Sequence, residues 1–382
     1  MVTTSYPREP GDPAGGFVAG FARWLASDGW EVEVVAAGPG ASRVDGLPVA
    51  RVDGRGLFYA GGAPDALASG GARAWVRAAS FQAALVRAVA ARAAGWDAIV
   101  SHWLAPSAIA VEVACAGRAR PHLAIAHSSD AWLLRRSKVG RAFVRRLARR
   151  ADLVYAADHL VLDGAPGRIV PMGIDAAPGD RARGRRRFGL DPDGVPDVPD
   201  APVRKDARMT ALFLGRLVPI KRLDLVLEAL PDDVDLIVAG DGPMRADWER
   251  RAPSRVRFLG EVRGADKGDL LAAADAFLFS STALPDGRHE GAPTAIVEAM
   301  AAGLPVVAAR GPGVDGLLRD GVDALVVEPT PAALRSALRR LADSPSLRRD
   351  LGERARRAAA VRDWSHVGPI LAMKLVGWTA RG

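Results

Sequence analysis

The sequence predicts an α/β protein made of two domains with parallel sheets. Short apolar segments alternate repeatedly with longer segments of helical periodicity, a pattern typical of parallel strands joined by helices. The chain has 382 residues, enough for two domains of ordinary size. Residues 176–208 are rich in Pro, Asp, Gly and Arg and lack hydrophobic periodicity. We therefore expect a first domain over 1–175, a linker or exposed insertion over 176–208, a second domain over 209–362 and a C-terminal helical segment over 363–382.

Composition restricts the function classes. The formal net charge of +8 suits an anionic partner, which could be nucleic acid, an anionic membrane surface or a nucleotide sugar. No nucleic-acid-binding module is recognisable, so we expect no nucleic acid partner. Cys115 is the only cysteine, which excludes a disulfide framework and a cysteine metal cluster. No apolar run approaches the roughly 20 residues that span a bilayer, and no signal peptide is recognisable. We therefore expect a soluble, cytoplasmic protein.

The first domain shows several strand–helix repeats. The predicted strands are 2–5, 31–36, 49–52, 97–100, 123–126 and 153–156. Gly15 and Gly16 open a predicted helix over 17–27, and a strand–Gly-Gly–helix turn brings backbone close to a ligand, although a simple tight turn has the same pattern. Residues 38–71 are rich in Gly and Pro and predict a long mobile segment.

Two histidines follow predicted strand ends, where the ligand crevice of a parallel sheet lies. His102 stands in H-W-L-A-P-S and His127 in A-H-S-S-D. A histidine at a strand end is often structural, and we assign that role to His102. Further along, eight Arg and Lys residues interleave with Val, Phe and Leu over 131–150 at helical spacing. This basic helix is either a packed helix with a solvated face or a surface that docks on an anionic membrane.

The second domain carries two motifs with chemical content. The first is G-R-L-V-P-I-K, which places Arg216 and Lys221 directly after a predicted strand over 210–215. Two fixed cations there can stabilise the charge of a phosphate leaving group. The second begins at Glu290 and reads E-G-A-P-T-A-I-V-E, so that Glu290 precedes and Glu298 lies within a helix that starts near Pro293. The free amides at that helix N-terminus are a natural seat for phosphate.

One further motif, G-P-G-V-D-G over 311–316, fits the glycine pattern of a dinucleotide site. Such a site also needs a helix of normal length and an acidic residue about 20 positions further on. Here the chain runs within a few residues into Asp320-Gly321 and a new strand over 324–327, so we reject that interpretation.

These motifs together resemble the retaining family 4 glycosyltransferases (glycosyl transferase group 1), which have the GT-B fold. The resemblance rests on E-G-x-P-x-x-x-x-E-A-M-A-x-G-x-P-V-V-A and G-R-L-x-x-x-K, with G-D-G-P over 240–243 and A-H-S-S-D in support. It departs from the family where Ser128 replaces a glycine and Met172 an asparagine. The resemblance implies two Rossmann-like domains facing across a cleft, with the C-terminal helix crossing back to the first domain.

The resemblance also implies a reaction and a set of site residues. The enzyme would move a sugar from a nucleoside-diphosphate sugar to an acceptor hydroxyl of a glycan, a lipid-linked glycan or a small molecule, with retention and without metal or cofactor. The implied catalytic residues are His127, beside the donor sugar, and Glu290, which holds its hydroxyls. The implied donor-binding residues are Gly16, Arg216, Lys221, Val262, Gly291, Ala292, Pro293, Thr294 and Glu298, the last of which would hold the ribose.

Two other functions fit the same donor site. A GT-B-type sugar-nucleotide epimerase or hydrolase would need no acceptor. A non-catalytic nucleotide-sugar or membrane-binding protein would bind donor without turnover, although the presence of His127, Arg216, Lys221, Glu290 and Glu298 together argues against it.

Overall fold

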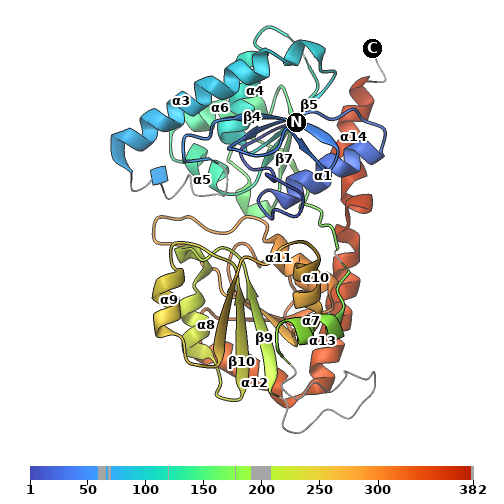
Figure 1. Ribbon diagram of the computed structural model, residues 1–382. Coiled ribbons are helices and arrows are strands. Elements are labelled where there is room, and N and C mark those ends of the chain that lie inside the picture. The colour runs from blue at the N-terminus through green and yellow to red at the C-terminus, as the bar shows by residue number, and fades with distance from the viewer. Residues whose placement is uncertain (59–65, 68–69, 119, 177, 191–207, 380–382) are drawn as a thin grey trace. The chain divides into compact units, whose positions relative to one another are not determined.

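The structure is a computed structural model that describes residues 1–58, 66–67, 70–118, 120–176, 178–190 and 208–379. The chain divides into two compact units (Figure 1). The first unit comprises Met1–Gly173 and Trp364–Gly382, and the second comprises Ile174–Asp363. Within the described residues, no helix has both the length and the apolar character needed to cross a membrane.

The first unit is an eight-stranded sheet in the order β3-β4-β2-β1-β5-β6-β7-β8, parallel except where β3 pairs with β4. Its strands are β1 (Val2–Thr3), β2 (Val34–Ala37), β3 (Arg43–Val44), β4 (Leu47–Val52), β5 (Ile99–His102), β6 (His122–Ala126), β7 (Asp152–Tyr155) and β8 (Arg168–Ile169). Its helices are α1 (Gly16–Ser27), α3 (Gly71–Ala90), α4 (Ile109–Ala114), α5 (Ser129–Arg135), α6 (Lys138–Leu147) and α14 (Trp364–Thr379).

The C-terminal helix α14 belongs to the first unit because its N-terminal end packs there. The Trp364 ring stacks on Phe21 of α1 with centroids 5.4 Å apart. A Cβ added to Gly173 would lie 2.6 Å from the same indole ring, so only glycine leaves room for it. Arg168 donates a hydrogen bond to the carbonyl of Ile370 on the next turns of the helix, at 2.6 Å. Chain segments about 200 residues apart are thereby joined in one fold.

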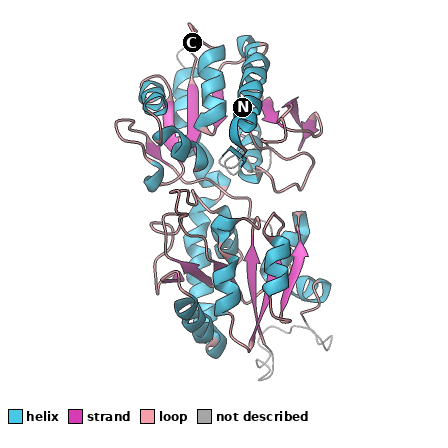
Figure 2. Cartoon of the chain, turned by 90° about the vertical axis from the view of Figure 1, so that its left-hand side faces the viewer, coloured by secondary structure: helices cyan, strands magenta, loops and turns pink. Residues whose placement is uncertain are grey.

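The second unit is a six-stranded parallel sheet in the order β11-β10-β9-β12-β13-β14. Its strands are β9 (Met209–Leu214), β10 (Val234–Ala239), β11 (Val256–Gly260), β12 (Ala276–Phe279), β13 (Val306–Ala309) and β14 (Ala324–Val327). Its helices are α7 (Arg181–Arg187), α8 (Leu223–Ala229), α9 (Arg245–Arg251), α10 (Gly264–Ala273), α11 (Thr294–Ala301), α12 (Pro331–Asp343) and α13 (Pro345–Ala359). Figure 2 shows helices on both sides of the strands in this unit.

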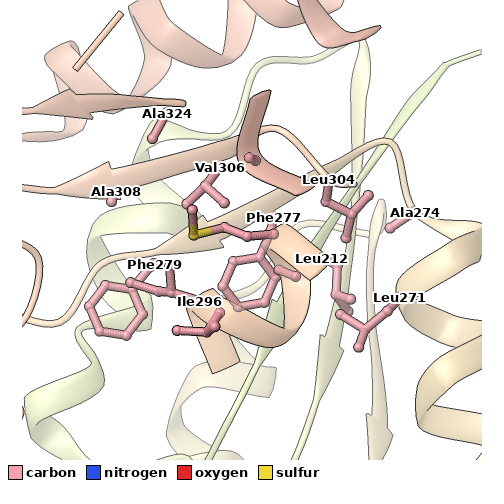
Figure 3. Packing of buried hydrophobic residues seen from close by; sticks show 14 of the residues in the cluster. Leu212, Leu271, Ala274, Phe277, Phe279, Ile296, Leu304, Val306, Ala308 and Ala324 are labelled. Carbon is pink, nitrogen blue, oxygen red and sulfur yellow. The ribbon is translucent and has the colours of Figure 1, made fainter. Parts of the chain in front are cut away.

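The core of the second unit follows from strand geometry. Successive side chains of a strand point to opposite faces, so a sheet covered on both faces needs continuous apolar runs. Leu212 and Phe277 accordingly join the cluster under α11, whereas the neighbouring Phe213 and Leu278 join the cluster on the other face. Figure 3 shows Leu212, Phe277 and Ile296 packed together in the first of these clusters. This packing holds α11, and therefore the loop before it, firmly on the sheet.

Three expectations need correction. The predicted basic helix over 131–150 is wrong, because it is two helices, α5 and α6, separated where the Ser137 hydroxyl caps α6 by accepting from the Gly140 amide at 2.9 Å. The predicted linker over 176–208 contains α7, which is held against α10 by ion pairs such as Arg187 to Asp266 at 2.6 Å. Residues 177 and 191–207 of that segment lie outside the described chain.

The third correction concerns the predicted mobile segment over 38–71. The strand predicted over 49–52 within this segment is confirmed as β4, and the structure adds β3, which turns back antiparallel on the start of β4. Residues 59–65 and 68–69 of that segment lie outside the described chain.

Each sheet has one switch point, at which the chain order reverses. In the first unit the reversal lies between β1 and β5, and in the second it lies between β9 and β12. Ligands of such sheets bind at the carboxyl ends of the strands on either side of the switch point. Each unit therefore has its own candidate ligand-binding edge at its switch point.

Candidate functional site

The loops after β9 and β12 bring Lys221 and Glu290 together, although they are 69 positions apart in sequence. The Lys221 Nζ atom lies 2.7 Å from Glu290 Oε1, and both side chains are less than one-fifth exposed. The Ser281 hydroxyl donates to the same carboxylate oxygen at 3.4 Å, and the Ser280 hydroxyl donates to the Lys221 carbonyl at 2.8 Å. The switch point of this sheet thus holds a fixed cation against a fixed carboxylate.

Glu298 has a partner that sequence reasoning missed. Its Oε1 accepts a hydrogen bond from Lys267 Nζ on α10 at 2.9 Å, and the two side chains are 19% and 25% exposed. An acid on the inward side of an apolar helix needs such a partner, because an unpaired buried charge is costly. The missing signal was tertiary: α10 and α11 are separate helices, and no local spacing relates Lys267 to Glu298.

The start of α11 provides backbone donors beside these pairs. Pro293 is the N-cap residue and no side chain caps the helix, so the first-turn amides from Thr294 onward have no side-chain acceptor. Gly291 is buried and Ala292 is half-buried in the loop that leads to Pro293. Free amides and the helix dipole favour an anion at this end.

The remaining donor-site predictions fall on the same edge of the second unit. Arg216 follows β9 and is half-buried. Val262 lies two residues beyond β11 and packs against the core cluster under α11. Both positions follow strand carboxyl ends, as Lys221 and Glu290 do.

The rejected 311–316 motif has a steric role here. The residues after β13 form turns with no helix, which agrees with the rejection. A Cβ added to Gly313 would lie 2.7 Å from the Glu290 Cβ atom, closer than two such atoms approach. Gly313 therefore packs directly against the Glu290 side chain, and its lack of a Cβ leaves the room that Glu290 occupies.

In the first unit, Gly15 and Gly16 stand at the start of α1, as predicted, and they have different roles. Gly15 caps α1 with a φ of +67°, and a Cβ there would lie 2.3 Å from the Ser5 carbonyl oxygen. A Cβ on Gly16 would meet nothing within 4 Å. The tight turn thus needs Gly15, whereas Gly16 leaves open space above the start of the helix.

His127 follows β6 in the same unit and contacts His102. The His102 Nδ1 atom lies 3.0 Å from His127 Nε2, so the two strand-end histidines form a hydrogen-bonded pair. Burial lowers the pKa of His127 to about 3, and burial also lowers the pKa of His102 well below its ordinary value. Both rings are therefore neutral near pH 7. The residue after His127, Ser128, has a φ of −179°, an extended backbone that needs no glycine.

Asp130 holds the two loops in place and was missed as a site residue. One carboxylate oxygen accepts from the Leu104 amide at 2.7 Å, and the other accepts from the amides of His127 and Ser128 at 3.1 and 2.9 Å. Burial raises the pKa of Asp130, and these amides oppose the shift. The signal for this role was present in A-H-S-S-D, since Asp commonly bonds backbone amides at the start of a helix.

The first unit also has a surface hollow of about 500 Å³ that is separate from these loops. It is lined by Glu112, His122 and Arg150 among others, and His122 begins β6. The hollow therefore lies toward the amino end of that strand, the opposite end from His127. In the parts of the chain that the structure describes, no group of three His, Cys, Asp or Glu side chains is arranged to hold a metal ion.

Comparisons with protein families match both units. Residues 197–358 match the sequence profile described as glycosyl transferases group 1. Residues 14–173 match the profile described as a glycosyl transferase 4-like domain.

Curated relatives share about one-third of their residues with the chain over the matched regions. The chain is 32% identical over 332 residues to a D-inositol 3-phosphate glycosyltransferase of Acidothermus cellulolyticus, covering 72% of this chain and 66% of the relative. It is 31% identical over 250 residues to a GDP-mannose-dependent alpha-mannosyltransferase of Mycolicibacterium smegmatis, covering 63% and 60%. The matches thus span about three-fifths to two-thirds of these relatives' length.

Solved structures match over nearly the full chain. The Anabaena protein HepE in complex with UDP and glucose has a TM-score of 0.70 at 19% identity, covering 99% of this chain and 100% of that one. Sucrose-phosphate synthase from Thermosynechococcus elongatus has a TM-score of 0.76 at 16% identity, covering 100% and 99%. At these identities the likeness bears on the fold alone.

Proposed function

Since the chain belongs to the glycosyl transferase group 1 family and has the GT-B fold, we propose that it transfers a sugar from a nucleoside-diphosphate sugar to an acceptor hydroxyl with retention of configuration. The observation that carries this proposal is the Lys221–Glu290 pair, 2.7 Å apart beside the uncapped N-terminus of α11. A cation, a carboxylate and free amides at one point match a donor that has a diphosphate at one end and sugar hydroxyls at the other. HepE is described with UDP and glucose, which supports a donor of this class.

In the proposed reaction, the bond between the anomeric carbon and the phosphate oxygen breaks as the acceptor oxygen attacks from the same face. Arg216, Lys221 and the first amides of α11 stabilise the charge that develops on the departing diphosphate. The departing phosphate oxygen takes the acceptor's proton, so the enzyme needs no separate general base. Because these cations supply the positive charge, we propose that the reaction needs neither a metal ion nor a cofactor.

Two carboxylates position the donor in this proposal. Glu290 accepts hydrogen bonds from the sugar hydroxyls, and its pairing with Lys221 fixes the orientation of its carboxylate. Glu298 accepts hydrogen bonds from the ribose while Lys267 holds its other side. His127 of the first unit donates a hydrogen bond to the sugar end. Gly16, Gly291, Ala292, Pro293, Thr294 and Val262 line the donor site in the same proposal.

The acceptor end is proposed more broadly as a glycan, lipid-linked glycan or small-molecule hydroxyl. A lipid-linked acceptor would draw the protein to a membrane, and α6 offers a surface for that. Val139 on this helix is 80% exposed, and Arg145 and Arg146 are exposed as well. A basic helix with an exposed apolar residue suits an anionic leaflet on the cytoplasmic side.

The first test is a thermal-shift panel of UDP-, GDP-, ADP- and dTDP-sugars on wild type and Glu298→Ala. A ligand at 100 times its Kd stabilises the folded state by roughly 2.7 kcal/mol, which is easily measured. We expect one nucleotide class to stabilise the wild type and to do so less in Glu298→Ala. A folded protein that none of the four classes stabilises would contradict the proposal.

Product analysis separates the transferase from an epimerase or hydrolase. With donor alone, a transferase should turn over slowly, whereas an epimerase or hydrolase should consume the donor rapidly. Proton NMR of the product's anomeric centre tests retention, and turnover in excess EDTA tests metal independence. Binding of donor with no turnover under any acceptor would favour a non-catalytic nucleotide-sugar-binding protein instead.

A further inference from the structure

The histidine pair of the first unit is enclosed by aromatic side chains. His102, the last residue of β5, is fully buried, and His127 is 7% exposed. Their ring planes differ by 13° and their centroids are 5.2 Å apart. Phe17 lies 5.0 Å from the His127 ring, and Phe21 meets the His102 ring edge-on at 6.1 Å. The two rings therefore have little freedom to turn independently.

Because both rings are neutral, each carries one N–H, and the bond between them requires one donor and one acceptor. In the first arrangement His102 Nδ1–H donates to His127 Nε2, and the proton of His127 is then on Nδ1. In the second arrangement His127 Nε2–H donates to His102 Nδ1, and the proton of His102 is then on Nε2. The surroundings of the outer nitrogens decide between the two.

The outer nitrogen of His102 favours the first arrangement. His102 Nε2 is enclosed and has no hydrogen-bond partner among the residues that the structure describes. In the second arrangement that atom would be a buried N–H without an acceptor, which is rarer in proteins and more costly than an unused acceptor. In the first arrangement His102 Nε2 is unprotonated, and only its lone pair is left without a partner. The first arrangement leaves the proton of His127 on Nδ1.

The outer nitrogen of His127 is available to a ligand. Within the described residues Nδ1 of His127 has no hydrogen-bond partner, and unlike His102 Nε2 it is not among the enclosed atoms. The backbone around His127 is held in place, because the Asp130 carboxylate accepts hydrogen bonds from the amides of both His127 and Leu104. The ring can therefore offer either a donor or an acceptor at one defined point, depending only on its tautomer.

We propose that His102 is a positioning residue that holds His127 in the Nδ1–H tautomer, so that His127 presents an N–H donor to an oxygen of the bound donor sugar nucleotide. This rests on the proposed function for the identity of the ligand, but the tautomer itself does not depend on it. A neutral N–H donor can bind a sugar hydroxyl or a phosphate oxygen without giving up its proton. The opposite tautomer would present a lone pair, which repels a phosphate oxygen.

The tautomer can be read directly by NMR on the full chain labelled with 15N-histidine. Long-range 1H–15N correlation distinguishes protonated from bare ring nitrogens, and the chain has only six histidines. His127→Gln identifies the His127 signals by their loss. We expect a protonated Nδ1 and a bare Nε2 for His127 in the wild type. The reverse pattern, or an exchange average of both tautomers, would overturn the proposal whatever the enzyme's activity.

A kinetic comparison then tests the role. His102→Phe keeps the ring volume and removes the hydrogen bond, whereas His102→Asn places an amide near the position of Nδ1. The exposed His366→Ala is the control. We expect kcat to fall about three- to tenfold in His102→Phe, as for the loss of one hydrogen bond, with the KM for donor little changed and with recovery in His102→Asn.

The outcomes are separable. An unchanged kcat in a folded His102→Phe would overturn the positioning role. An equal loss in His102→Phe and His102→Asn would also overturn it, since a packing role alone predicts no recovery. The expected NMR pattern in a protein that turns over no nucleotide sugar would support the tautomer assignment and contradict the proposed function instead.

Discussion

Gly313→Ala should disturb the donor site through a single methyl group. Gly313 lies outside the motifs that carry the resemblance in the sequence, yet its added Cβ would lie 2.7 Å from the Glu290 Cβ atom. Ordinary contact begins at 3.4 Å, so the two atoms must separate by about 0.7 Å (3.4 − 2.7). The φ angle of Gly313 is not in the left-handed region, so the effect is steric. Gly311→Ala is the matched control, because its Cβ would meet only the Ser281 carbonyl oxygen at 3.7 Å.

The size of the effect follows from the pair that Glu290 makes. If Glu290 moves by that amount, its 2.7 Å contact with Lys221 lengthens toward 3.4 Å, beyond the 2.7–2.9 Å typical of a charge-assisted hydrogen bond. Overpacking in a tight site costs about 1–3 kcal/mol. If about 1.4 kcal/mol of that cost is lost from the free energy of donor binding, the affinity for the donor falls roughly tenfold.

Isothermal titration calorimetry can compare the binding of a nucleoside diphosphate with the binding of its sugar conjugate. Only the sugar conjugate has the hydroxyls that Glu290 is proposed to hold, so the difference in affinity isolates the effect at Glu290. We expect Gly313→Ala to weaken binding of the sugar conjugate roughly tenfold more than binding of the bare nucleotide, and Gly311→Ala to alter neither. Circular dichroism confirms that both variants are folded. If both variants bind both ligands like wild type and melt at the same temperature, Glu290 is not lodged against Gly313 and the reasoning fails.

Three further predictions concern other parts of the molecule. Lys267→Met should weaken nucleotide binding about fivefold, because Glu298 loses the partner that lies 2.9 Å away. In binding titrations Lys267→Arg should largely restore the affinity, and tighter binding by Lys267→Met would contradict the proposed role of the pair. The folded pKa of His127, about 3, lies below its unfolded value near 6.5, so its contribution to stability is full above pH 6.5 and is lost as pH falls. Because the pKa of His102 is lowered as well, both proteins should lose stability in urea unfolding as pH falls from 6.5 to 4.5. The loss should be steeper in wild type than in His127→Gln by up to about 1.4 kcal/mol per pH unit, and identical pH profiles would refute it. Reversing Arg145 and Arg146 of α6 to Glu should lower the affinity for phosphatidylserine vesicles, measured by sedimentation, by roughly 30-fold or more, at about 1 kcal/mol per basic residue. A double Arg→Glu change on α12 should not have this effect, and equal effects would exclude α6 as the docking surface.

Much of the fold could be predicted because the signals are local. Alternating strand and helix patterns, and the run from Glu290 to Ala308, depend on neighbours within a few residues, so they can be read from the chain alone. The GT-B fold and the family are confirmed. The prediction failed where one local signal overrode another: the helical spacing over 131–150 continues through Ser137, but that residue caps a new helix.

The candidate site was less completely predictable, because its contacts join residues far apart in sequence. Local motifs identified Lys221, Glu290 and Glu298, and the structure brings the first two together. The roles of these residues remain predictions. Lys267 and Gly313 carry no local signal, since each matters only through the element that packs against it.

By itself, the sequence determined the family, the two Rossmann-like sheets and which chemical groups stand at the strand ends, because these depend on contiguous residues and short-range periodicity. Only the tertiary structure decided which of those groups touch. His102 ends β5 and His127 follows the neighbouring β6, 25 positions further along the chain. Their 3.0 Å contact exists because β5 and β6 pair in register and Asp130 accepts hydrogen bonds from both loops. Pairing between strands and packing between helices are long-range interactions, and they determine the partners of each charged or polar side chain at the site.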